Sequence, residues 1–190
     1  MLELLRPLLA RTVAVIAPRA TAVMLGGGLL TGFGSQVIDL RGQLPVSETR
    51  HYGQRQLSAV QGLVWHHSAT AGATIHSIAE YHVEVKKWPA IAYHYAIGWD
   101  GVVYVLNDAT TISYQAQGYN SHTIGVVLIG NYEEHEMSDA MKASAARLED
   151  HLADKYGLQY VWLHRDTKAT LCPGKYAAGW LRGLTYGRKP

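Results

Sequence analysis

Two histidines and the single cysteine are the residues of this sequence best suited to bind a metal ion. His66 lies at the end of an apolar run, His164 follows the apolar run at 160–163, and Cys172 comes eight residues after His164. Two imidazoles and one thiolate suit a borderline-soft ion such as Zn²⁺. Three protein ligands leave the fourth tetrahedral position for water, as in catalytic zinc sites. The alternative is that the histidines are structural and that Cys172 is a small buried residue.

The histidine pair His66-His67 cannot serve one site together. The pair ends the stretch VWHH, which is typical of a buried strand. Neighbouring side chains of a strand point to opposite faces. At most one of the two imidazoles therefore belongs to a shared site.

The elements that must position these residues are predicted by periodicity and turn signals. Thr74 and Ser138 are the predicted N-caps of two helices, and Gly157 ends the second helix. The predicted strands are 63–67, 92–97, 102–106, 124–129 and 160–163, and the predicted helices are 74–86 and 138–156. The sum is an α/β domain with one central mixed sheet flanked by helices. Alternation along 92–97 places Tyr93 and Tyr95 on one face of the sheet.

Composition excludes several classes of function. The 190 residues carry 17 basic and 15 acidic side chains, a formal net charge of +2, which is too balanced to indicate a nucleic-acid partner. One cysteine excludes an internal disulfide. The length favours one main domain with an appendage.

The first fifty residues differ from the remainder. We assign 1–40 to an apolar, helical N-terminal segment, 41–60 to a polar linker and 61–190 to the main domain. The uncharged run at 20–34 is shorter than the roughly 20 residues that cross a bilayer upright. The basic residues before it favour an export or membrane-anchor segment. Docking to a partner assembly and packing on the chain's own domain remain alternatives.

Four stretches occur in the order typical of one enzyme family. They are VWHHSAT, YHVEVKKWPAIAYHYAIGWDGVVY, GYNSHTIGVVLIGNY and LHRDTKATLCPG. Over 61–181, about two thirds of the chain, the sequence resembles the zinc-dependent N-acetylmuramoyl-L-alanine amidases, a family that includes phage lysozyme-type amidases and peptidoglycan recognition proteins. The resemblance implies that His66, His164 and Cys172 hold Zn²⁺ and that His67 is structural.

The same resemblance assigns catalytic and substrate-binding roles. Tyr93 matches the family's active-site tyrosine, which can donate a hydrogen bond to an oxyanion. Thr170 stands where phage members carry lysine and recognition proteins carry threonine, and Lys168 alternates onto the same side. Asn120 and His122 fall in a loop that lines the family's substrate groove.

Two further positions depart from the family pattern. Gln115 replaces a frequent histidine, and Val127 lies near the position where some relatives carry a glutamate base.

The resemblance implies hydrolysis of the amide between N-acetylmuramic acid and L-alanine in bacterial peptidoglycan, by a phage endolysin or a virion-associated enzyme. It places the protein in the periplasm or cell wall, tethered to the inner membrane or bound to a phage particle through 1–40. One alternative is a recognition module that binds peptidoglycan without cleaving it. Another is a cysteine peptidase with Cys172 as its nucleophile, although such a cysteine normally precedes its histidine.

Overall fold

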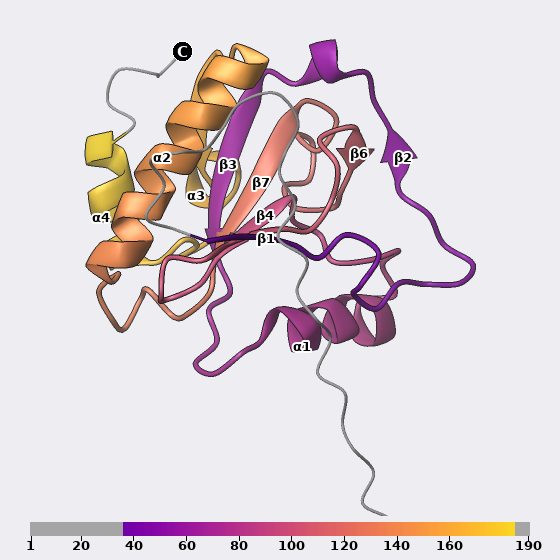
Figure 1. Cartoon of the computed structure of the whole chain (residues 1–190), viewed down its shortest axis with the longest axis horizontal. Coiled ribbons are helices and arrows are strands. Elements are labelled where there is room, and N and C mark those ends of the chain that lie inside the picture. The colour runs from indigo at the N-terminus through magenta and orange to yellow at the C-terminus, as the bar shows by residue number, and fades with distance from the viewer. Residues whose placement is uncertain (1–35, 185–190) are drawn as a thin grey trace, which may run out of the picture.

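A six-stranded mixed sheet forms the centre of the computed structural model, which describes residues 36–184 (Figure 1). The strand order is β1-β5-β4-β7-β3-β8. Strand β3 pairs in parallel with both β7 and β8, whereas β4 and β5 form an antiparallel hairpin. The strands of this sheet are β1 (Val37–Asp39), β3 (Gly62–His67), β4 (Tyr95–Ile97), β5 (Val103–Val105), β7 (Thr123–Leu128) and β8 (Tyr160–Leu163). A separate two-stranded sheet consists of β2 (Gly53–Gln54) and β6 (Thr111–Ile112).

Helices cover both faces of the sheet (Figure 1). Helices α2 (Asp139–Tyr156) and α4 (Lys175–Leu184) pack on one face through the larger apolar core. Helix α1 (Ile75–Glu80) continues as one π-helical turn, η2 (Tyr81–Val85), and packs on the other face. The remaining helices are η1 (Leu57–Ala59), a 3-10 helix, and α3 (His164–Thr167). The predicted fold class is therefore confirmed for the described residues.

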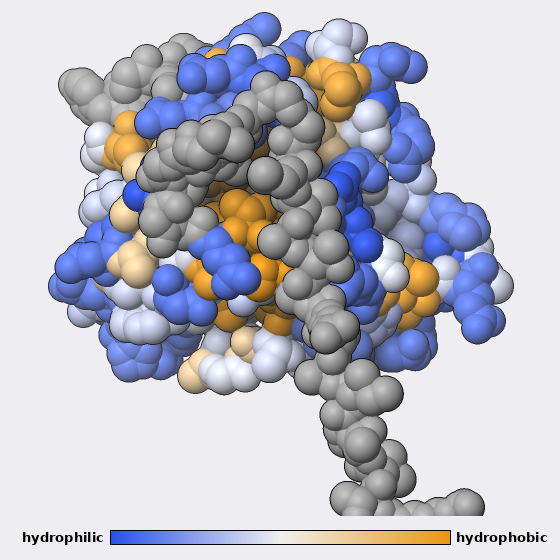
Figure 2. Space-filling model, in the orientation of Figure 1, coloured by the Kyte–Doolittle hydropathy of each residue, from blue (hydrophilic) through white to orange (hydrophobic). Residues whose placement is uncertain are grey.

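The two central strands, β3 and β7, are buried along their whole length. Leu63 and Trp65 of β3 lie in the core under α2, whereas His66 points to the face of α1. A strand covered on both faces accounts for the continuous apolar runs in the sequence. Figure 2 shows that hydrophilic residues dominate the rim of one face of the molecule, with apolar residues gathered nearer its middle.

Helix caps follow the predicted chemistry. The Thr74 hydroxyl accepts a hydrogen bond from the Ser77 backbone N–H, and the Ser138 hydroxyl accepts one from that of Met141. Gly157 adopts the left-handed conformation at φ 62° and ends α2. These three boundary predictions are confirmed.

The prediction that Tyr93 and Tyr95 share one face of the sheet is wrong. Tyr95 lies in the core under α2, and Tyr93 packs on the opposite side with the smaller apolar cluster. The strand begins only at Tyr95, so residue 93 lies in the irregular segment before it, where the alternation rule does not apply. Helix α4 was not among the predicted elements.

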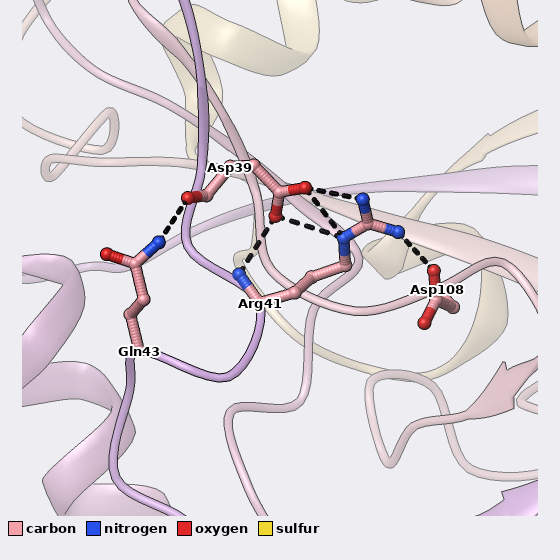
Figure 3. Close-up of polar contacts among 4 residues, drawn as sticks. All are labelled: Asp39, Arg41, Gln43 and Asp108. Carbon is pink, nitrogen blue, oxygen red and sulfur yellow. Dashed lines mark hydrogen bonds and ion pairs between the residues drawn. The ribbon is translucent and has the colours of Figure 1, made fainter. Parts of the chain in front are cut away.

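The described fold begins before residue 61. Strand β1 extends the sheet at one edge, within the segment that the sequence pattern assigned to the N-terminal appendage. Arg41 forms ion pairs with Asp39 and Asp108, and the Gln43 side chain donates to the Asp39 carbonyl at 2.7 Å (Figure 3). The Arg41 guanidinium lowers the pKa of Asp39. These contacts attach β1 and the following turn to the loop after β5.

Arg55 ties the predicted linker to the interior. Its buried guanidinium donates to the carbonyls of Ala109 at 2.7 Å, Asn120 at 2.6 Å and Thr123 at 2.9 Å. Arg55 thus anchors one point of the segment 41–60 to the interior, while most side chains of 48–58 are exposed. No helix within 36–184 is long and apolar enough to cross a membrane, and the predicted apolar run at 20–34 lies outside the described residues.

We expect Arg55→Met to lower the free energy of unfolding by about 3 kcal/mol, because three buried carbonyls lose a charged donor. The matched variant Arg41→Met should lose less than about 1 kcal/mol, because its ion pairs are partly exposed. Urea unfolding of the two variants measures the difference. Equal losses would contradict the structural role assigned to Arg55.

Candidate metal centre and its cavity

Three potential metal ligands meet at one edge of the central sheet. The ligand atoms of His66, His164 and Cys172 all lie within 4.8 Å of one another. His66 Nδ1 and Cys172 Sγ are 3.8 Å apart. His66 is near the end of β3, His164 is the first residue of α3 directly after β8, and Cys172 lies between α3 and α4. The parallel register pairs Trp65 with Leu163, so the chain delivers both imidazoles at the same edge.

The donor set fits a zinc ion. Ligands bound tetrahedrally at Zn–N and Zn–S distances of about 2.1 and 2.3 Å lie roughly 3.3–3.6 Å from one another. The 3.8 Å separation of His66 Nδ1 and Cys172 Sγ is close to that value. His66 is buried, and the other two ligands are half-buried, so a bound ion keeps access to the cavity described below.

Burial sets the protonation states around this cluster. Desolvation lowers the pKa of His66 well below its usual value and lowers that of His164 to about 4. Both imidazoles are therefore neutral and able to ligate near pH 7. Burial also raises the pKa of the Cys172 thiol to about 11. A nucleophilic cysteine needs a lowered pKa, so the cysteine-peptidase alternative finds no support here.

The two neighbouring histidines have different partners. His66 Nε2 lies 2.7 Å from Gln115 Oε1, which leaves His66 Nδ1 facing Cys172. His67 Nδ1 accepts a hydrogen bond from the Tyr132 backbone N–H at 3.1 Å, on the opposite face. The expectation that only one of the pair faces the site agrees with this geometry. His67 instead binds the backbone of Tyr132 at the end of the strand.

Tyr93 lies beside the ligands. Its ring centroid is 5.2 Å from that of His66 and 5.7 Å from that of His82. Burial and the nearby Cys172 raise the pKa of Tyr93, so the phenol keeps its proton near pH 7. Tyr93 also lines the cavity, so its O–H can be offered to a ligand there.

The two candidate polar helpers differ in position. Lys168 borders the cavity and its positive charge helps lower the pKa of His164. The Thr170 hydroxyl accepts a hydrogen bond from the Cys172 backbone N–H at 3.2 Å. Thr170 is not among the residues that line the described cavity. Its contact orients the loop that carries Cys172.

A cavity of about 920 Å³ lies beside the three ligand candidates, and His164 is the one of them that lines it. Its walls combine residues of α1, η2, the segment before β4 and the loop before β7. The lining includes Ser77, Ile78, Tyr81, His82, Lys86, Trp88, Tyr93, Tyr114, Gln115, Asn120, His164 and Lys168. Asn120 borders this space, while its Oδ1 accepts from the Ala116 N–H at 2.7 Å; its role in substrate binding stays a prediction.

His122, the second predicted substrate-binding residue, is not among the lining residues. Its ring packs on Tyr119 and Tyr160, with centroids 5.8 and 6.4 Å away. Sequence reasoning also missed the aromatic walls Trp88 and Tyr114, because neither stands at a strand end or in a ligand-like spacing.

His82 and His94 accept hydrogen bonds from the backbone in the interior. His82 Nδ1 accepts from the Ala92 N–H at 3.1 Å, and His94 Nδ1 accepts from the Gly125 N–H at 3.0 Å. Burial lowers the pKa of His82 to about 4 and that of His94 to about 3. The hydrogen bond from Gly125 joins the segment before β4 to the middle of β7.

A sequence model described as N-acetylmuramoyl-L-alanine amidase matches residues 56–175. The chain belongs to this amidase family. The match includes all three ligand candidates, Tyr93 and the loop with Asn120. The resemblance inferred from the four sequence stretches is thereby confirmed.

The chain aligns with only part of the length of its individual relatives. Peptidoglycan-recognition protein SC1a of Drosophila melanogaster is 29% identical over 121 residues, which are 62% of this chain and 65% of that protein. N-acetylmuramoyl-L-alanine amidase of Sus scrofa is 31% identical over 118 residues, 60% of this chain and 20% of that enzyme. The chain thus spans less than two thirds of the length of these curated relatives.

The amidase fold is shared with solved structures. The endolysin N-acetylmuramoyl-L-alanine amidase LysCS from Clostridium intestinale URNW superposes with a TM-score of 0.66 at 23% identity. The alignment covers 78% of this chain and 93% of LysCS. At this identity the likeness establishes the fold.

Buried neutral histidines predict a loss of stability at acidic pH. The folded-state pKa of His94 is about 3 and the unfolded value is 6.5, so the unfolded chain binds the extra proton between these values. Stability present above pH 6.5 is therefore lost as the pH falls, by up to about 1.4 kcal/mol per pH unit for this histidine. Urea unfolding of metal-free protein at pH 7, 5.5 and 4.5 measures the slope.

The control is His94→Asn, which keeps an acceptor near the Gly125 N–H but does not titrate. We expect a shallower pH dependence in this variant than in the parent. An unchanged slope in His94→Asn would contradict the assignment.

Proposed function

We propose that this chain hydrolyses the amide bond between N-acetylmuramic acid and L-alanine in bacterial peptidoglycan, with Zn²⁺ held by His66, His164 and Cys172. The observation that carries the proposal is the convergence of these three ligand atoms within 4.8 Å, beside a large cavity that His164 lines, in a chain of the amidase family. Zinc in such a site supplies Lewis-acid chemistry, because it lowers the pKa of a water molecule and polarises a carbonyl group.

The side chains around the site supply the remaining chemistry. Tyr93 donates its O–H to the carbonyl oxygen that gains negative charge during attack, and burial keeps this proton in place. The Lys168 ammonium borders the same space and stabilises negative charge there. Thr170 acts through its hydrogen bond to the Cys172 backbone and so orients the loop.

The cavity matches an amphiphilic substrate of sugar and peptide. Trp88 and Tyr114, whose rings meet edge to face at 6.1 Å, offer apolar surfaces suited to a sugar ring. Asn120 and Gln117 offer amide groups suited to a peptide backbone. Such a mixture of aromatic walls and few polar groups is typical of pockets that orient one ligand.

Digestion of purified peptidoglycan tests the proposal. We expect the zinc-loaded protein to release stem peptides with a free L-alanine amine, as measured by mass spectrometry. Chelation should abolish release and added Zn²⁺ should restore it. Binding to peptidoglycan without cleavage would instead establish a recognition module, and cleavage that survives chelation but not thiol alkylation would establish cysteine chemistry.

Tyr93→Phe separates the role of the hydroxyl from that of the ring. We expect kcat to fall about 100-fold, with KM nearly unchanged, because one oxyanion donor is lost while the ring packing on His66 is kept. Zinc content and melting temperature serve as controls and should match the parent. A loss of zinc in this variant would assign Tyr93 to the metal site instead.

The cellular role follows from the substrate. A peptidoglycan hydrolase acts in the periplasm or cell wall, and we propose that location for this chain. We further propose a bacteriolytic, endolysin-like role, supported by the fold shared with LysCS. Lysis of outer-membrane-permeabilised cells by the active protein, but not by Cys172→Ser, is the expected result.

A further inference from the structure

We infer that Gln115 is a positioning residue that fixes which nitrogen of His66 is free for the metal, and that Thr123 in turn fixes the orientation of the Gln115 amide. The inference rests on the proposed zinc function. It concerns two residues that orient a ligand without themselves binding the metal. It comes from a chain of short hydrogen bonds leading from a backbone carbonyl to the buried ligand.

The series of hydrogen bonds begins at a carbonyl oxygen, which can only accept. The Thr123 hydroxyl lies 2.7 Å from the Tyr119 carbonyl oxygen, which can only accept. The hydroxyl has one hydrogen and donates it there. Toward its second neighbour, Gln115, the same oxygen must therefore accept.

This assignment orients the amide of Gln115. Gln115 Nε2 lies 2.7 Å from the Thr123 hydroxyl oxygen and donates to it. Gln115 Oε1 then faces His66 Nε2 at 2.7 Å and can only accept. His66 Nε2 must carry the proton, which leaves the lone pair of Nδ1 directed at Cys172 Sγ, 3.8 Å away.

The opposite amide orientation disables the ligand. With the amide nitrogen toward His66, the Nε2 atom would have to accept, and a neutral imidazole would carry its proton on Nδ1. That nitrogen could not bind a metal without losing the proton. The flipped state also forces the Thr123 hydroxyl to donate to Gln115, so the Tyr119 carbonyl loses a hydrogen bond.

The surrounding structure holds the chain in place. A Cβ atom on Gly125 would lie 2.6 Å from Gln115 Cγ, so the glycine in β7 leaves the space that this side chain occupies. Buried Arg55 donates to the Thr123 carbonyl at 2.9 Å and fixes the backbone that carries the hydroxyl. Gln115 itself is 6% exposed, so most of its side chain is shielded from water.

Thr123→Val tests the inference because it changes neither the ligand nor Gln115. The isosteric variant removes the acceptor that holds the amide nitrogen, so both orientations of Gln115 become accessible. We expect nitrogen-15 NMR of the metal-free protein to show a proton shared between both nitrogens of His66, where the parent shows it on Nε2 alone. Zinc affinity, measured by competition with a chromophoric chelator, should fall about tenfold or more.

Two further variants exclude a general structural effect. Thr123→Ser keeps the hydroxyl and should retain parent tautomer and zinc affinity. Adding Gln115→Glu to Thr123→Val should restore zinc affinity, because both carboxylate oxygens accept and the orientation no longer matters. If Thr123→Val fails to fold, Gln115→Met removes the acceptor directly and should weaken zinc binding by a similar factor.

The outcomes separate this inference from the proposed function. Parent-like zinc affinity and a single Nε2–H tautomer in Thr123→Val would overturn the positioning role, whatever the enzyme cleaves. A parent protein that binds no zinc would overturn the proposed function, while the tautomer measurement on metal-free protein would still decide the role of Gln115.

Discussion

The parallel pairing of β3 with β8 in one register is the constraint on which the site depends. It aligns Trp65 with Leu163, so His66 and His164 emerge at the same sheet edge. A slip by one residue would turn His66 into the core and His67 toward the cavity. Gly62 helps set this register, because a Cβ atom there would lie 1.9 Å from the Tyr160 ring. The metal centre is thus a consequence of strand alignment.

The third ligand is placed by local contacts instead of by the sheet. The Cys172 carbonyl accepts from the Arg165 backbone N–H at 3.1 Å, and its sulfur accepts from the His67 N–H at 3.4 Å. Gly174 follows at φ 92°, and a Cβ atom there would lie 2.2 Å from the Tyr132 backbone. This glycine permits the close approach that seats the loop against the strand end.

Period and turn chemistry were sufficient to predict the central strands and both capped helices, because each is encoded within a short stretch. The ligand candidates His66, His164 and Cys172 came instead from their residue types and from the family resemblance. Features fixed by distant contacts were not predictable in this way. Arg55 stands in a polar stretch that is typical of a linker, and only its carbonyl partners around residues 109–123 reveal its burial. Helix α4 contains Gly179 and Gly183, which weaken helix propensity, so its burial against the sheet outweighs its composition. Gln115 departs from the family pattern, and only its hydrogen bonds to His66 and Thr123 reveal a role for it.

The electrostatics of the site follow from the same burial that stabilises the fold. The neutral imidazoles bring no charge, and desolvation opposes ionisation of Cys172, so the thiolate forms only when a cation is present to offset that cost. With a dication bound as proposed, one thiolate would leave it only partly neutralised, and Lys168 adds a further positive charge at the cavity wall. The field in the cavity would then favour negative charge on the carbonyl oxygen of the proposed substrate. Tyr93 can complement that charge because burial keeps its proton, so one cause, desolvation, prepares both the ligands and the hydrogen-bond donor.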